Sequence, residues 1–284
     1  MDASNNFEKY HGLGNDFVVV DVSDTALDVE QMCATESWRA HVMAGCDRHR
    51  GVGADGVILC DRRGLSGGVR MIIFNQDGSR PQMCGNGVRC VMAWAFRHGL
   101  VKDDVLDVYS DAGLRRCEFG GVDADGVVMT HVGMGEALEK RFDDVELDGE
   151  LFSLWRVNMG NPHAVVLDTM PPLDEVDRYG VYANAVRECF EEGVNLEFVS
   201  YDDAREEYDV VVYERGVGRT QACGTGACAV AVALWESGIE DVESEVRIRL
   251  PGGGLGVYLR GQEVWMFGPA VHVFDGRCSW PWEA

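Results

Sequence analysis

Short hydrophobic runs separated by glycine-rich turns dominate the chain, and this pattern predicts more strand than helix. The runs at residues 17–22, 57–59 and 69–74 are rich in aliphatic side chains and predict buried strands. Similar runs predict strands at residues 164–167, 208–213, 246–250, 255–259, 264–267 and 271–274. A helix is predicted over about residues 29–44.

Two further segments, residues 88–98 and 227–237, are apolar on nearly every side. A helix of that composition is buried all round rather than on one face. Gly99 and Gly238 follow them as helix-ending residues. The sequence therefore predicts two central helices enclosed by short strands.

The surroundings of the two helices repeat. Fifteen positions lead from Cys84 to Gly99 and from Cys223 to Gly238, and nine lead from Asn75 to Cys84 and from Glu214 to Cys223. A repeat of about half the chain indicates two similar domains, because solenoid repeats have periods of roughly 20–50 residues. We expect an α/β (α+β) fold of two pseudo-symmetric domains, each with short β-strands wrapped around a central buried helix.

Composition narrows the class of protein. The 284 residues are 46 % hydrophobic and 26 % charged, which is typical of globular proteins. The net charge of −23 disfavours nucleic acid as a partner, and the chain has no apolar run that would span a membrane. Residues 1–6 lack the apolar core of a signal peptide, so we expect the protein in the cytoplasm. The ten cysteines are then expected to be reduced thiols and not disulfides.

The chemistry is expected at two Cys-Gly-x-Gly turns that begin at Cys84 and Cys223. Their glycines leave backbone N–H groups uncovered at a helix start, where a carboxylate can bind. The partial positive charge there is expected to lower the thiol pKa from about 8.5. Pseudo-symmetry predicts that the two thiols face each other across a cleft between the domains. Such a pair can invert a carbon next to a carboxylate, one thiol removing the α-proton and the other returning one.

That reaction requires no metal, flavin or pyridoxal phosphate, so we expect no cofactor. The chain has only three lysines, Lys9, Lys102 and Lys140, and none lies in a phosphate-binding context suited to a Schiff base. A zinc-binding structural protein is the alternative from another class, with Cys84, Cys90, Cys223 and Cys228 as ligands. The pairs have five and four intervening residues, whereas zinc pairs usually have about two to four.

The sequence resembles the diaminopimelate epimerase family, the cofactor-independent enzymes that interconvert LL- and meso-diaminopimelate. The matching segments run in order over nearly the whole chain: Lys9 to Phe17, Gly53 to Gly56, Phe74 to Ser79, Met83 to Cys90, Asn161 to Val165, Gly193 to Asn195, Glu214 to Gly218 and Ala222 to Ala227. The pair of Cys-Gly-Asn-Gly and Cys-Gly-Thr-Gly turns, together with Glu-Arg-Gly-Val-Gly, is the most specific of these features.

The resemblance implies roles for individual residues. Cys84 and Cys223 would be the two catalytic acid/base groups, with His163 close to them. Backbone N–H groups of Gly85, Asn86, Gly224 and Thr225 would bind the reacting carboxylate. The amino groups and the far carboxylate would be held by Asn15, Asn75, Asn161, Asn195, Glu214 and Arg215. At Gly56 some family members carry a glutamine that touches substrate, and that contact is missing here.

The resemblance also implies an organisation and a biological setting. Residues 1–130 would form the first domain, with residues 275–284 returning to it, and residues 131–274 the second. The protein would be a homodimer acting in lysine and peptidoglycan precursor biosynthesis, with a small-molecule substrate as its partner. A relative that racemises another amino acid on the same fold is the alternative within the class.

Overall fold

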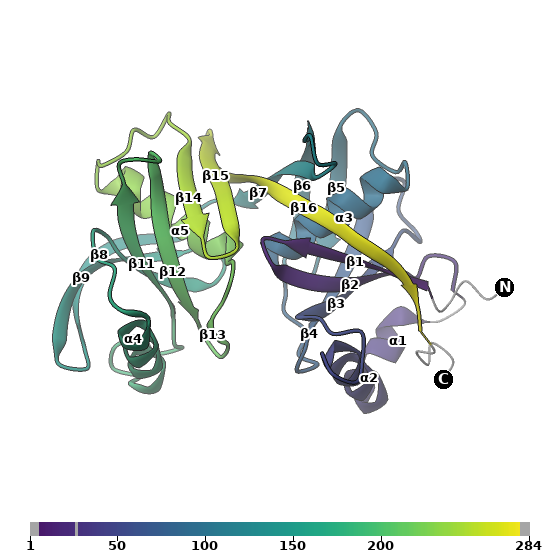
Figure 1. Cartoon of the computed structure of the whole chain (residues 1–284), viewed down its shortest axis with the longest axis horizontal. Helices are drawn as coiled ribbons and strands as arrows, with labels where there is room; N and C mark the ends of the chain where they lie inside the picture. The colour runs from purple at the N-terminus through teal and green to yellow at the C-terminus, as the bar shows by residue number, and fades with distance from the viewer. Residues whose placement is uncertain (1–5, 26–27, 279–284) are drawn as a thin grey trace. The chain divides into compact units, whose positions relative to one another are not determined.

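The computed structural model describes residues 6–25 and 28–278, and these form two compact units (Figure 1). The first unit contains residues up to 132 and those from 269 onward, and the second contains residues 133–268. The chain passes from one unit to the other within strand β7 (Val128–Gly135) and again within strand β16 (Glu263–Arg277).

The first unit is a sheet wrapped around helix α3 (Gly85–Arg97). Its strands are hydrogen-bonded in sequence order: β1 (Asn6–Gly12), β2 (Asn15–Asp21), β3 (Gly56–Asp61), β4 (Val69–Asn75), β5 (Val105–Ser110), β6 (Gly113–Val122) and the start of β7. The end of β16 pairs antiparallel with β1. Helix α3 contacts β1, β2, β4, β5 and β6, so strands surround it.

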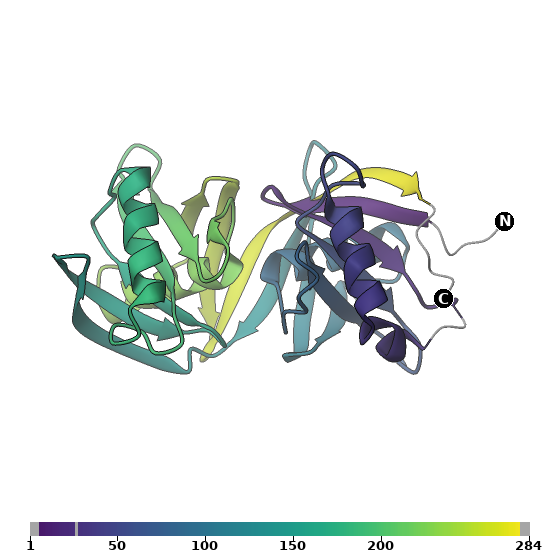
Figure 2. The ribbon, with the colours of Figure 1, turned by 90° about the horizontal axis from the view of Figure 1, so that it is seen from below.

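Two short helices cover the other face of this sheet, α1 (Val29–Cys33) and α2 (Glu36–Cys46) (Figure 2). Trp38 and Val42 of α2 pack in one cluster with Val18, Val57 and Leu59 from the strands. The strands are therefore buried on both faces, which explains why they read as continuous apolar runs.

The second unit repeats this plan around helix α5 (Gly224–Glu236). Its hydrogen-bonded order is β8 (Glu139–Leu147), β9 (Glu150–Asn158), β10 (Pro162–Val166), β11 (Asn195–Asp202), β12 (Glu207–Glu214), β14 (Val246–Leu250), β15 (Gly253–Arg260) and the start of β16, with β13 (Gly218–Arg219) beside β12. Helix α4 (Leu173–Ala185) covers the other face and packs Val176 and Tyr179 against Leu196 and Phe198. The predicted α/β fold of two pseudo-symmetric domains is confirmed.

The two central helices are buried as predicted, and each starts before the predicted first residue. Helix α3 begins at Gly85 and α5 at Gly224, because Cys84 and Cys223 are their N-caps. The glycines that the sequence assigned to a turn thus form the first helical turn. None of the helices among residues 6–25 and 28–278 combines the length and apolar character that a membrane span requires.

Other elements differ from the prediction. The single helix expected over residues 29–44 is two helices, because the Thr35 side chain accepts the Trp38 N–H and starts a new one. Residues 264–267 and 271–274 belong to one strand, β16, which pairs first with β15 and then with β1. Helix α4 and strands β8 and β9 were not predicted, because they mix apolar and charged residues, and β11 was not predicted because Glu197 interrupts its apolar run.

The second crossing lies at Pro269, while the sequence placed the return to the first unit at residue 275. The Pro269 carbonyl accepts a hydrogen bond from Nε of Arg89, which is fully buried in helix α3, at 3.1 Å. The last residues of the expected returning segment, 279–284, lie outside the described residues.

Candidate functional site

Cys84 is the N-cap of helix α3, and its sulfur accepts the Gly87 N–H at 3.4 Å. A thiol in this position replaces the hydroxyl or carboxylate that usually satisfies a free N–H group of the first turn. The Cys84 side chain is partly exposed, whereas Gly85, Asn86 and Gly87 are buried. The Cys84 sulfur is thus held at the partly exposed end of a buried helix terminus.

Asn15 and Asn86 lie beside this thiol. The Oδ1 atom of Asn15 accepts a hydrogen bond from Asn86 Nδ2 at 3.1 Å, and the Cys84 sulfur lies 3.8 Å from the same oxygen. The Nδ2 atom of Asn15 donates to Asp55 at 2.9 Å, and Asp55 is paired with Arg48. Asp55 therefore fixes the Asn15 amide with its oxygen toward Cys84.

Asn75, at the end of β4, is engaged within its own turn. Its Nδ2 donates to the Ser79 hydroxyl at 2.9 Å, and its backbone N–H donates to the Ser79 carbonyl. The structure therefore places Asn75 in the turn that follows strand β4 and precedes Cys84.

Cys223 repeats the geometry of Cys84 at the start of α5. Its sulfur accepts the Gly226 N–H at 3.3 Å and lies 3.5 Å from the Thr225 hydroxyl. Only 5 % of Cys223 is exposed, so this thiol is less accessible than Cys84. The two helix starts are equivalent in backbone geometry, and their surroundings differ.

A chain of polar side chains continues from Thr225 into the interior. Asn161 Nδ2 donates to the Thr225 hydroxyl at 3.3 Å, and Asn161 Oδ1 lies 3.1 Å from Nε2 of His163. His163 Nδ1 lies 2.6 Å from Glu197 Oε1, and both of these side chains are completely buried. Thus the predicted site residues Asn161, His163, Cys223 and Thr225 come together, with Glu197 at the inner end.

The electrostatics of Cys223 contradict the expectation of a lowered thiol pKa. Burial raises the pKa of Cys223 well above its ordinary value, and the charges of Glu214 and Glu197 raise it further. The Gly226 N–H and the Thr225 hydroxyl favour the thiolate but are outweighed. At this helix terminus, burial and the two carboxylates together outweigh the groups that stabilise a thiolate.

Both carboxylates beside Cys223 are themselves perturbed. Burial raises the pKa of Glu197 and also that of Glu214, while hydrogen bonds and the His163 charge act in the opposite direction. The Glu214 carboxylate accepts a hydrogen bond from Thr220 at 2.5 Å and also interacts with Cys223. A proton can therefore be held in this cluster at a pH where exposed carboxylates have lost theirs.

Asn195 is buried opposite His163 in the sheet and holds the turn that carries Arg215. Asn195 Oδ1 accepts the Arg215 N–H at 2.9 Å, and its Nδ2 donates to the Pro162 carbonyl at 3.1 Å. The Arg215 side chain is exposed and its Nη1 donates to the Glu192 carbonyl. Asn195 thereby ties the backbone of the Arg215 turn to the start of β10.

Sequence reasoning assigned no role to Glu197 or Asp55. Glu197 had a signal, since it is a charged residue inside the apolar run that becomes β11. Asp55 stands in the Gly53–Gly56 segment, and its contact with Asn15 depends on the parallel pairing of β2 with β3.

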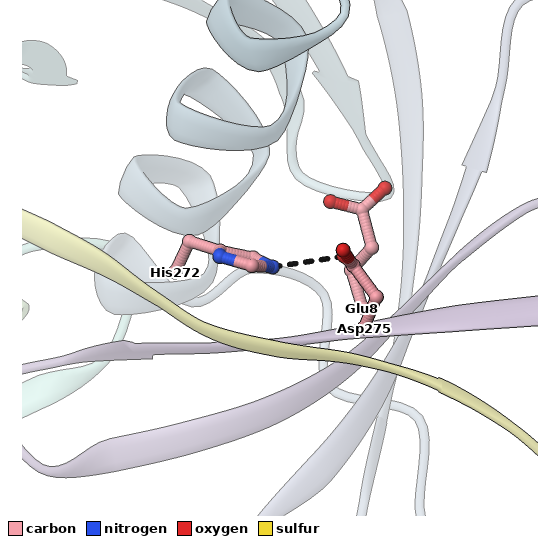
Figure 3. Close-up of side chains that lie close together, drawn as sticks. All are labelled: Glu8, His272 and Asp275. Carbon is pink, nitrogen blue, oxygen red and sulfur yellow. Dashed lines mark hydrogen bonds and ion pairs between the residues drawn. The ribbon is translucent and has the colours of Figure 1, made fainter.

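A separate cluster of potential metal ligands, Glu8, His272 and Asp275, joins strands β1 and β16 (Figure 3). His272 Nε2 lies 2.9 Å from Asp275. A guanidinium nitrogen of Arg97 lies 2.7 Å from both Glu8 and Asp275. Because the Arg97 guanidinium already lies between the two carboxylates, the cluster is an ion-pair network that anchors the end of α3.

Comparison with known proteins gives consistent sequence matches. A family model for diaminopimelate epimerase matches residues 7–138 and 155–273. The diaminopimelate epimerase of Desulforudis audaxviator is 40 % identical over 288 residues, covering 95 % of this chain and 98 % of that one. The enzyme of the same name from Methanothermobacter thermautotrophicus is 38 % identical, covering 95 % and 97 %.

Solved structures show similarity of fold at low sequence identity. A probable proline racemase from Agrobacterium radiobacter has a TM-score of 0.71 at 17 % identity, covering 98 % of this chain and 94 % of that one. A predicted epimerase from Pseudomonas aeruginosa has a TM-score of 0.71 at 14 % identity, covering 97 % and 99 %.

The first turn of α5 has no room for a side chain at position 226, which yields a test of the geometry. A Cβ on Gly226 would lie 2.8 Å from Glu197 Oε1 and 3.2 Å from the Cys223 sulfur. We expect Gly226→Ala to lower the melting temperature by several degrees, because either the buried carboxylate or the thiol must shift. Gly254→Ala is the matched control, since its Cβ would meet nothing closer than 3.9 Å. Equal melting temperatures for the two variants would contradict the packing described here.

Proposed function

The chain belongs to the diaminopimelate epimerase family, and we propose that it interconverts LL- and meso-diaminopimelate with Cys84 and Cys223 as acid and base. As a member of this family the protein is an isomerase of lysine biosynthesis. The observation that carries the mechanism is the repeated helix start, where each thiol caps a buried helix from the same N-cap position.

The proposed chemistry follows from what each helix start offers. Backbone N–H groups of the Gly85–Asn86 and Gly224–Thr225 turns would bind the carboxylate next to the reacting carbon. They also stabilise the negative charge that grows on this carboxylate when the α-proton leaves. One cysteine, as thiolate, takes the proton, and the other, as thiol, gives a proton to the opposite face. The thiolate and thiol have exchanged roles at the end of the reaction, so no net charge is transferred.

We propose that the remaining contacts hold the rest of the substrate. Asn15, Asn75, Asn161, Asn195 and Glu214 would bind its amino groups and orient it. Arg215 would bind the far carboxylate, because its planar guanidinium can form two parallel hydrogen bonds to a carboxylate. The exposed position of Arg215 supports this role, since the side chain is available to a ligand.

The first test removes each thiol separately. We expect Cys84→Ala and Cys223→Ala each to lower epimerisation by about 10³-fold or more, since each direction needs both an acid and a base. The measurement is conversion of LL- to meso-diaminopimelate, with α-hydrogen exchange in D₂O followed in parallel. Cys33→Ala and Cys189→Ala are the controls, because these partly buried thiols lie away from the helix starts. Full turnover by either active-site variant would contradict the mechanism.

The second test concerns specificity. Arg215→Lys keeps the charge but loses the planar fork, and we expect kcat/KM for diaminopimelate to fall by about 10²-fold, a change of roughly 3 kcal/mol. Arg219→Lys is the control, because Arg219 is an exposed arginine of the same hairpin paired with Asp177. An unchanged kcat/KM would assign Arg215 to the protein surface. A panel of other amino-acid stereoisomers would then identify any substrate that does not need the hydrogen bonds from Arg215.

We also propose that the protein works as a homodimer in the cytoplasm, with its small-molecule substrate rather than nucleic acid or membrane as partner. The β8–β9 hairpin at the end of the second unit's sheet leaves Leu138, Phe142 and Leu151 largely exposed, which supports self-association. All ten cysteines are free thiols, as expected in a reducing compartment. Sedimentation equilibrium should give twice the chain mass, and a monomer at micromolar concentration would contradict the dimer.

A further inference from the structure

Three neighbouring strands of the second unit each place a titratable side chain beneath the start of α5. His163 lies on β10, Glu197 on β11 and Glu214 on β12. Within the sheet, Glu197 stands opposite Val165 on one side and Val212 on the other, so a charged residue occupies a position between two valines. Its side chain is completely buried.

The position of the Glu197 carboxylate relative to Cys223 is defined by Gly226. A Cβ on Gly226 would meet Glu197 Oε1 at 2.8 Å and the Cys223 sulfur at 3.2 Å. The carboxylate and the thiol therefore lie against the same helical residue. The other carboxylate oxygen, Oε2, is buried and has no hydrogen-bond partner of ordinary geometry within residues 6–25 and 28–278, and the one backbone group that interacts with the carboxylate is the Ala164 N–H. A buried carboxylate with one unsatisfied oxygen destabilises a protein, which indicates a role other than stability.

The hydrogen bonds around His163 determine where its protons lie. The amide N–H of Asn161 donates to Thr225, so the Asn161 oxygen faces Nε2 of His163. An amide oxygen only accepts, and Nε2 must therefore carry a proton. A second proton lies in the 2.6 Å contact between Nδ1 and Glu197 Oε1. Moving that second proton between nitrogen and oxygen leaves the total charge of the pair unchanged.

We infer that Glu197 is a positioning residue for the reaction, which holds His163 in this orientation and keeps Cys223 in its thiol form in the resting enzyme. This inference rests on the proposed function in so far as Cys223 acts as acid or base. The Glu197 side chain is completely buried, so it is not exposed to a ligand. It acts through its charge beside the sulfur and through the chain His163–Asn161–Thr225 that ends at Cys223.

The groups that face Cys223 determine the direction of the effect. Glu214 and Glu197 both disfavour the thiolate, and the Gly226 N–H and the Thr225 hydroxyl favour it. Removing the Glu197 carboxylate while Glu214 remains should therefore make Cys223 ionise more readily. A thiol that must deliver a proton to a forming carbanion needs to remain protonated until the substrate arrives. Glu197 supplies that condition from a completely buried position.

The direct experiment measures ionisation of Cys223 without using turnover. In a Cys84→Ala background, the rate of iodoacetamide labelling at Cys223 is followed against pH by peptide mass spectrometry. Because His163 balances part of the Glu197 charge, we expect Glu197→Gln to move the midpoint to lower pH by only about half a unit, in the direction set by the carboxylate that lies beside the sulfur. Glu150→Gln, which removes an exposed carboxylate from β9, should leave the midpoint in place.

Two further variants complete the design. Glu197→Met removes the charge with a side chain of similar length and should give the same downward shift, so it replaces Glu197→Gln if that variant does not fold. Glu197→Asp retains the carboxylate and should keep the midpoint near that of the parent. An unchanged or raised midpoint in a folded neutral variant would overturn the inference, and so would an equal shift in Glu150→Gln.

The enzymatic counterpart is the pH profile of kcat/KM with the intact thiol pair. In Glu197→Gln we expect the alkaline limb to move to lower pH by a similar amount, because Cys223 is the thiol that its surroundings keep protonated. A residue with only a structural role would lower kcat/KM at every pH without moving the limb. The labelling experiment decides the role of Glu197 even if diaminopimelate is not the substrate. A failure of the proposed function can therefore be distinguished from a failure of the inference about Glu197.

Discussion

The structure depends on how two fully buried helices begin. The first N–H groups of a helix have no partner within it, and in a buried helix water cannot supply one. Here the sulfur atoms of Cys84 and Cys223 accept one of these N–H groups each, at 3.4 and 3.3 Å. The helix start is thus completed by sulfur, a weaker acceptor than the oxygen atoms usual at an N-cap.

The sheets that enclose the two helices restrict which residues can form the first helical turn. Each first turn packs directly against the side chains of the strands around it. At Gly87 an added Cβ would lie 3.2 Å from Ile58, and at Gly226 it would lie 2.8 Å from Glu197. Glycine at these positions therefore serves close packing. In one unit the neighbour is an aliphatic side chain, and in the other it is a buried carboxylate.

This difference makes the two thiols unequal despite their common backbone geometry. Cys84 is partly exposed, beside the amide oxygen of Asn15 that Asp55 orients. Cys223 is buried beside Glu214 and Glu197, with His163 paired to the inner carboxylate. The repeated helix start supplies two similar groups, and the strand residues below each helix make them different.

The sequence by itself determined the features that depend on local pattern. The all-round apolar segments after Cys84 and Cys223 identified the two central helices, their matched spacing identified the two similar units, and the aliphatic runs located most strands. Local pattern also placed the cysteines at helix starts, since glycine turns act within a few residues. Tertiary structure decided what lies next to those cysteines. The approach of Glu197 to Gly226, the pairing of Glu197 with His163 and the raised pKa of Cys223 depend on the register of β10, β11 and β12. A helix terminus lowers a thiol pKa through the dipoles of residues that are its neighbours in the sequence. Burial and the carboxylates of residues far away in the sequence act on the thiol only after folding has brought them next to it.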